Sequence, residues 1–220
     1  SRVPGGESTR PNAESVSQDE ELSRVIPVIE ALAKHADVPI SIDTSKPEVM
    51  RAAVAAGATF INDVFAFRND GAIEAAAELG VPVCLMHMLG TPRTMQVAVE
   101  YDDMLAQVRQ FLTERIFACE MAGIAKKNIV IDPGFGFGKH LEHNLSLLAN
   151  LDYFKQLGVP VLAGVSRKSM IGKITGRELG QRAVGSAAGA LLAVQNGASI
   201  IRVHDVAETK DALAMLAAVQ

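Results

Sequence analysis

The chain has 220 residues, of which 49% are hydrophobic and 21% charged, and its formal net charge is −4. This composition supports one sizeable core and argues against general nucleic-acid affinity, so any anion site must come from a local cluster of basic side chains. Cys84 and Cys119 fit neither a metal motif nor a disulfide framework, and no membrane span or signal peptide is apparent, so we expect a cytoplasmic protein with no membrane partner.

Short apolar runs typical of strands alternate with helical patterns along the chain. S-x-x-E capping boxes at Ser17–Glu20 and Ser45–Glu48 each predict the start of a helix. The expected strands are 38–43, 59–63, 81–88, 129–132, 159–165 and 199–206. The expected helices are 17–33, 45–57, 71–80, 102–122, 144–157, 180–196 and a last helix after the final strand.

This alternation predicts a parallel sheet, because a helical crossover returns the chain to the same edge. No repeat or linker divides the chain, so residues 1–220 are expected to form a single domain. Both an open sheet and a barrel satisfy the pattern. We favour a (β/α)8 TIM barrel, because polar residues follow nearly every strand and a barrel draws on all of its βα loops at one face.

The segment 128–139, NIVIDPGFGFGK, is the most informative stretch. A buried strand ends in Asp132, and Pro133 with three alternating glycines then allows the backbone to approach a ligand closely. A carboxylate at the tip of a buried strand is costly unless it is paired. The alternative is that Asp132 only caps a turn.

Other strands end in the same way. Because side chains alternate along a strand, Arg202 and His204 share one face with Ile200, and only one of Asn62 and Asp63 points inward. We expect the inward residue to be Asn62. The expected strand tips together offer Asp43, Asn62, His87, Asp132, Arg167 with Lys168, and Arg202 with His204.

Several of these residues also have structural interpretations. Asp43 could cap the following helix, Arg167 could pair with an outer acid, and His87 between two methionines is typical of a core histidine. Met86 is more typical of packing than of a ligand contact, and Glu7 more typical of an exposed loop than of catalysis.

The polar tips favour one class of ligand. Carboxylates and an amide can hold a flat heterocycle that bears N–H donors, and clustered cations can hold a phosphate or diphosphate. The sequence therefore indicates a planar, hydrogen-bonding ring joined to an anionic leaving group.

Seven motifs in one order resemble dihydropteroate synthases. They are GGESTRP at 5–11, SIDTSKPEV at 41–49, IND at 61–63, LMHM at 85–88, DPGFGFGK at 132–139, SRKSMIG at 166–172 and RVHDV at 202–206. The resemblance implies a TIM barrel, a homodimer, and Mg2+-assisted condensation of p-aminobenzoate with 6-hydroxymethyl-7,8-dihydropterin diphosphate in folate synthesis. It also implies inhibition by sulfonamides.

The resemblance also assigns roles to residues. It implies a pterin site of Asp43, Asn62, Met86, Asp132, Lys168 and Arg202, and a diphosphate site of Arg10, Arg202 and His204. It implies a p-aminobenzoate site of Thr9, Pro11, Phe137 and Ser169. The residues expected to act in catalysis are Asp132, Lys168, Arg202 and His204.

The sequence departs from the family before Gly5. There the family has a first strand, a loop with an Asn metal ligand and a first helix, whereas this sequence has only SRVP. We therefore expect a barrel without its first βα unit and with no metal ligand of its own. Two alternatives are a pterin-dependent methyltransferase that works with a corrinoid protein, against which Lys168 and His204 argue, and a non-catalytic pterin-binding module.

Overall fold

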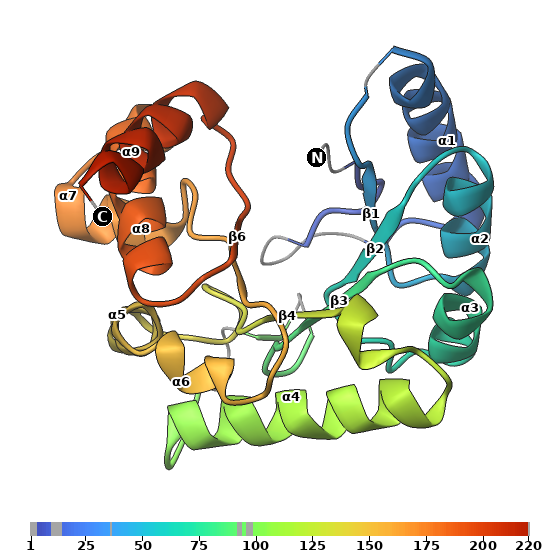
Figure 1. Ribbon diagram of the computed structural model, residues 1–220, viewed down its shortest axis with the longest axis horizontal. Helices are drawn as coiled ribbons and strands as arrows, with labels where there is room; N and C mark the ends of the chain where they lie inside the picture. Colours follow the sequence, from blue (N-terminus) through green and yellow to red (C-terminus); the bar gives the residue numbers. More distant parts are fainter. Residues whose placement is uncertain (1–3, 10–14, 36, 92–93, 96–98, 220) are drawn as a thin grey trace.

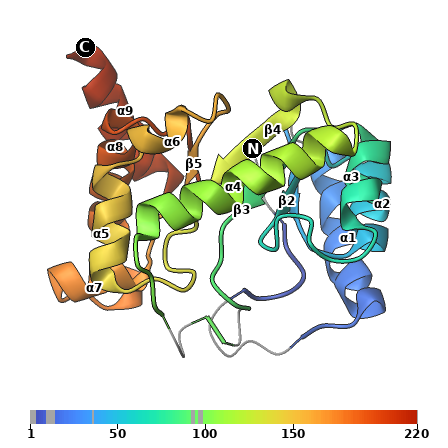
Figure 2. The ribbon, with the colours of Figure 1, turned by 90° about the horizontal axis from the view of Figure 1, so that it is seen from below.

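The computed structural model describes residues 4–9, 15–35, 37–91, 94–95 and 99–219. Parallel strands occupy its centre, and helices follow around them in chain order, from α1–α3 through α4 to α5–α9 (Figure 1). Figure 2 shows α4 crossing one side of the strands, between these two groups of helices. In the described part of the chain, no helix is long and apolar enough to cross a membrane.

All strand pairs are parallel, as the sequence predicts. The strands are β1 Ser41–Asp43, β2 Phe60–Asp63, β3 Val83–Met86, β4 Ile129–Asp132, β5 Leu162–Ala163 and β6 Ile200–Ile201. The first four form one sheet in chain order, and β5 pairs with β6. A bridge between Ile131 and Val161 continues the series from β4 to β5, and a bridge between Gly5 and Asp43 adds a neighbour outside β1. Within the described residues, β6 and the Gly5 segment share no strand pairing.

The inner and outer faces of the strands follow from this register. Leu85 and Ile131 are partners and belong to the main core, which includes residues of the surrounding helices. Cys84 and Val130 lie one position earlier and face the opposite side, because side chains alternate along a strand. That side holds a separate inner cluster of Cys84, Val130 and Leu162, with Phe60 packed against it.

Most helices lie where the sequence predicts them. They are α1 Gln18–His35, α2 Pro47–Ala55, α3 Ala72–Leu79, α4 Met104–Met121, α5 Leu141–Ala149, α6 Asp152–Lys155, α7 Ser169–Thr175, α8 Ala183–Gln195 and α9 Val206–Ala218. At α1 the prediction of a cap is confirmed, since Ser17 Oγ accepts from the Glu20 N–H at 3.3 Å.

Three expectations about the elements are wrong, and one helix is absent from the prediction. The second capping box does not form, because α2 begins after Lys46 with Pro47 in its first turn and no side-chain cap. The expected helix 144–157 begins earlier and is divided into α5 and α6. Helix α7 is not predicted at all. The last strand ends at Ile201, and Val206 instead begins α9.

Candidate active site

Strand register brings the polar ends of the strands to two successive side-chain levels on one side of the sheet. Asp43 pairs with Asn62, Asn62 with Cys84, and Cys84 with Val130. The side chains of partner residues in parallel strands project to the same side of the sheet. Here Cys84 and Val130 belong to the inner cluster, so this is the inner side. Asp43 and Asn62 therefore lie on the inner side of the strands, while Met86 and Asp132 are partners one side-chain level higher.

The two polar residues at the end of β2 differ in function. Asp63 accepts hydrogen bonds from the N–H groups of Phe65 at 2.9 Å and Phe67 at 2.7 Å, so it shapes the turn after the strand. Burial raises the pKa of Asp63 to about 7. Asn62 is buried, and its side-chain nitrogen has no hydrogen-bond partner among the described residues. A buried N–H donor without a partner is costly, so Asn62 offers a donor that a ligand would satisfy.

Asp132 and Lys168 form the charged centre of the inner side. Asp132 Oδ1 accepts from the Gly134 N–H at 2.8 Å, and the carboxylate is almost completely buried. Burial raises the pKa of Asp132, while the Lys168 charge acts in the opposite direction. Burial likewise lowers the pKa of Lys168 to about 8, with Asp132 opposing it. Each charge thus supports the other at a site with little water.

The ammonium of Lys168 is also fixed by the glycine-rich loop. It donates to the Phe135 carbonyl and lies 4.7 Å from the centre of the Phe137 ring. Cation–ring contacts of this kind are attractive. Phe137 and the ammonium therefore lie side by side in the region beyond the carboxyl ends of the strands, which we call the mouth.

Arg202 connects the two ends of the strand series. Its Nη2 donates to Asp43 Oδ2 at 2.7 Å, and its side chain is 39% exposed, against 13% for Asp43. Asp43 therefore has an ion-pair partner and does not cap α2, which excludes the cap interpretation. An anionic ligand would have to compete with Asp43 for this guanidinium.

His204 lies beside Ser166. The Ser166 hydroxyl oxygen accepts from the His204 backbone N–H at 3.1 Å and lies 2.9 Å from His204 Nδ1. The hydroxyl and the imidazole therefore share a hydrogen bond whose direction depends on the histidine tautomer. Arg167 turns away and pairs with Asp205, with Nε 2.9 Å from Oδ2, so the expectation of an outer acid partner is confirmed.

Sequence reasoning missed the role of Lys139. This lysine is buried, and its ammonium lies 2.9 Å from His87 Nδ1, 3.0 Å from the Gly134 carbonyl oxygen and 3.1 Å from that of Phe137. Burial lowers its pKa to about 7, but three acceptors match its three N–H donors. Burial also lowers the pKa of His87 to about 2, so His87 is a neutral core histidine, as one interpretation of the sequence held.

The loop that contains these groups is tightly packed. A Cβ atom at Gly134 would lie 1.8 Å from the His87 carbonyl oxygen, and Gly134 has a φ of 77°, so only glycine fits there. Asn144 accepts from the Gly136 N–H at 2.7 Å, and the Tyr101 hydroxyl donates to the Gly138 carbonyl at 2.9 Å. A lysine directly after a glycine-rich loop was the available signal, but its inward direction is not visible in the sequence.

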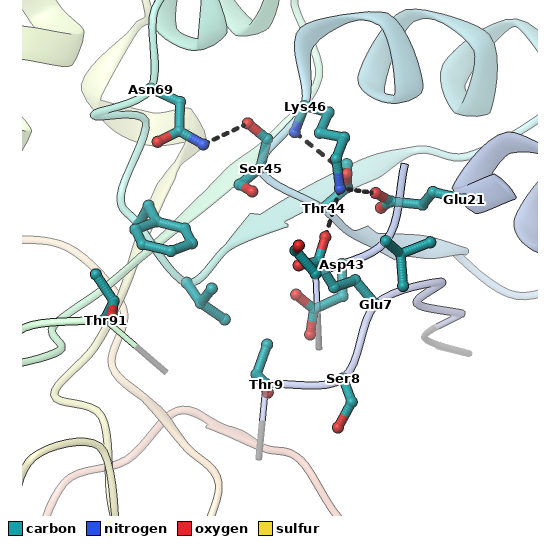
Figure 3. Close-up of a pocket in the computed structure, with 14 residues that line it drawn as sticks. Glu7, Ser8, Thr9, Glu21, Asp43, Thr44, Ser45, Lys46, Asn69 and Thr91 are labelled. Carbon is teal, nitrogen blue, oxygen red and sulfur yellow. Dashed lines mark hydrogen bonds and ion pairs between the residues drawn. The ribbon is translucent and has the colours of Figure 1, made fainter. Parts of the chain in front are cut away.

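The remaining expected residues lie around the mouth or outside the described chain. Met86 is buried in a cluster with Val64, Met88 and Met95, against which Phe137 packs. Ser169 is exposed at the first turn of α7. Thr9 and Asp43 line a cavity of about 290 Å3 that Glu7 and Lys46 also line (Figure 3). Arg10 and Pro11 lie outside the described residues. The ligand roles of all these residues stay predictions.

Comparison with known proteins identifies the family. A family model described as pterin binding enzyme matches residues 5–204. The dihydropteroate synthase of Escherichia coli K12 is 55% identical over 214 residues, which cover 97% of this chain and 76% of the relative.

Solved structures agree with this result. The Xanthomonas albilineans dihydropteroate synthase with 4-aminobenzoic acid superposes with a TM-score of 0.95 at 59% identity, covering 99% of this chain and 78% of that one. The Yersinia pestis enzyme in a sulfonamide drug complex gives 0.97 at 50% identity, covering 99% and 79%. The barrel-type fold inferred from the sequence is thereby supported, and the chain belongs to the dihydropteroate synthase family of pterin-binding enzymes.

Proposed function

We propose that this chain condenses p-aminobenzoate with 6-hydroxymethyl-7,8-dihydropterin diphosphate, giving 7,8-dihydropteroate and pyrophosphate for folate synthesis. The observation that carries the proposal is the meeting of Asn62, Asp132, Lys168 and the Arg202–Asp43 pair at one mouth, within a chain of this family. Related structures contain 4-aminobenzoic acid, a sulfonamide drug and 7,8-dihydropteroate, and we extend these ligands to this chain.

The buried groups suit the pterin ring. Asp132 accepts hydrogen bonds from ring N–H groups, while the unpartnered Asn62 nitrogen donates to a ring acceptor. The Lys168 ammonium, which lies beside Phe137, donates a hydrogen bond to the pterin ring. A carboxylate with few competing waters favours the ring most strongly when the ring is electron-poor, which is its state as the reaction proceeds.

The reaction separates charge between two parts of the mouth. The bond between the pterin methylene carbon and the bridging oxygen breaks, and its electron pair leaves with pyrophosphate. Arg202 and His204 stabilise that negative charge, and Asp132 stabilises the positive charge on the pterin methylene. The amine nitrogen of p-aminobenzoate attacks the carbon with its lone pair and then releases a proton.

The protein needs no covalent nucleophile for this chemistry, because the neutral aromatic amine is itself the nucleophile. Cys84 is the cysteine nearest the site, and it is completely buried. Burial raises the pKa of its thiol far above the usual range, which keeps it unreactive.

We propose Mg2+ as the metal of the reaction. Mg2+ prefers oxygen ligands and binds through substrate phosphates with one or two carboxylates. Among the described residues, no three His, Cys, Asp or Glu side chains form a metal cluster. The described side chains do not make a dedicated site, so the ion is expected to arrive on the diphosphate.

The assembly and location are also proposals. Val184 on α8 and Met215 on α9 are 80% and 68% exposed, and the two helices are in contact, which favours a homodimer through α8 and α9. Both cysteines are free and buried, as expected in a reducing cytoplasm. The main core extends from Val25 to Ala198, which supports a single domain over 1–220.

A mixing assay tests the function. The protein, p-aminobenzoate, the pterin diphosphate and Mg2+ should yield dihydropteroate and pyrophosphate in equal amounts. Asp132→Asn should lose most of this activity, whereas Asp152→Asn, at an exposed position of α6, should keep it. Pterin binding without pyrophosphate release would contradict the proposal and indicate a binding module.

A further inference from the structure

A group of three charged side chains lies where the segment Pro4–Thr9 meets α1 and α2. Lys46 Nζ donates to Glu21 Oε2 at 2.6 Å and also pairs with Glu7 (Figure 3). Glu7 belongs to the segment, Glu21 to the first turn of α1, and Lys46 precedes α2. We call these three residues the Glu7–Lys46–Glu21 clamp, because one ammonium joins three parts of the chain.

The burial of the Glu21 carboxylate requires a cation beside it, and Lys46 supplies that cation. The Glu21 side chain is fully buried, and its Oε1 has no hydrogen-bond partner among the described residues. A buried carboxylate is costly unless a cation pairs with it. Burial lowers the pKa of Lys46, but the hydrogen bonds with Glu21 and Glu7 outweigh this effect and raise it overall, so the ammonium stays charged.

Backbone contacts also hold the segment Pro4–Thr9 in place. A Cβ atom at Gly6 would lie 2.6 Å from Glu21 Cγ, so the chain passes directly over that side chain. Arg24 Nη1 donates to the Gly6 carbonyl at 2.8 Å, and the Asp43 N–H donates to Pro4 at 3.0 Å. These contacts fix the start of the segment, whereas the clamp fixes Glu7, only two residues before Thr9.

We propose that the Glu7–Lys46–Glu21 clamp positions Thr9 for p-aminobenzoate and thereby sets the affinity for this substrate. The inference rests on the proposed function. Thr9 and Lys46 line the same cavity, yet two carboxylates already engage the Lys46 ammonium. Lys46 is therefore a positioning residue, and the pterin groups on β2 and β4 do not depend on it.

The kinetic test compares two substitutions near α2. Lys46→Met keeps the aliphatic stem and removes the charge, and it should raise the KM for p-aminobenzoate about tenfold while kcat and the KM for the pterin diphosphate stay within about twofold. Lys46→Arg should restore most of the loss. Arg51→Met on α2 is the matched control, because it removes an exposed ion pair of 3.0 Å with Glu78 on α3 and should change neither KM.

Two outcomes would overturn the inference. Equal changes for both substrates would show that Lys46 supports the fold in general. A loss confined to p-aminobenzoate and absent for the uncharged 4-aminobenzamide would show that Lys46 binds the substrate carboxylate directly.

A second measurement does not depend on activity. Hydrogen exchange of the backbone amides of residues 5–9 should be faster in Lys46→Met than in Arg51→Met, and Glu7→Gln should add little to Lys46→Met because the two share one interaction. Unchanged exchange would refute the clamp. Absence of turnover in the wild-type protein would instead refute the proposed function, and exchange would still decide this inference.

Discussion

The two halves of the mouth hold their charges in different ways. The inner half, made by Asn62, Asp132, Lys139 and Lys168, is largely buried, and its cations donate to backbone carbonyls and His87. The outer half, made by the Arg202–Asp43 pair, His204 and the Glu7–Lys46–Glu21 clamp, is partly exposed apart from the buried Glu21, and it relies on ion pairs between side chains.

This difference separates two tasks. A buried, prearranged set of donors and acceptors can distinguish one flat ring from another, because an unmatched polar group there is costly. An ion pair such as Arg202–Asp43 can exchange its carboxylate for a phosphate, because water compensates during the exchange. We therefore expect ring recognition to depend on the inner half and the charge of the leaving group to depend on the outer half.

The largest effect is expected at Lys139. Lys139→Met leaves His87 and two buried carbonyls without a donor, so the free energy of unfolding should fall by about 2–4 kcal/mol. Urea unfolding measures this loss, with the exposed Lys127→Met as a control that should stay within about 0.5 kcal/mol. Equal stability of the two variants would mean that the inner half is not held by its buried cation.

The next effect tests the outer half. Arg202→Ala should weaken binding of the pterin diphosphate about 10- to 100-fold more than binding of the free pterin, because charge-assisted hydrogen bonds to phosphate are lost. Calorimetry with both ligands measures the difference. Equal losses would make Arg202 a stacking or structural residue and remove the division between the halves.

Asp132 provides the converse experiment in the inner half. Asp132→Asn keeps an acceptor for the Gly134 N–H but loses the charge, so binding of the free pterin should weaken by about 1–3 kcal/mol. Binding of the pterin diphosphate should weaken by the same amount as binding of the free pterin. Unchanged pterin affinity in calorimetry would exclude Asp132 from ring binding.

The smallest effect concerns pH. Because burial lowers the pKa of Lys168 to about 8, the ammonium is charged below that pH and loses its proton above it. Pterin affinity should therefore decline between about pH 8 and 9 in the wild-type protein, and Lys168→Met should abolish this step. A pH profile that is the same in both proteins would assign the titration to another group.

Much of the fold follows from local patterns. The apolar run that ends in Asp132 is confirmed as β4 with the expected bounds, and the helix between Gly71 and Gly80 forms with both glycines as its caps. Alternation along β2 predicts that only one of Asn62 and Asp63 faces inward, and the expectation that this is Asn62 is confirmed, since it lies on the same face as Phe60 of the inner cluster. The prediction of one helix over 144–157 is wrong, because helix propensity does not show where tertiary packing divides a helix into two, here α5 and α6.

The sequence by itself determined the alternation of parallel strands and helices, the family motifs and the polar residues at the strand tips, because each depends on neighbouring residues. Only the tertiary structure decided which charges pair. Arg202 meets Asp43 across 159 positions, Lys139 turns inward to His87, and Lys46 joins Glu7 to the buried Glu21. Such pairs depend on distances between segments far apart in the chain and on exclusion of water from their contacts, and neither can be read from local sequence.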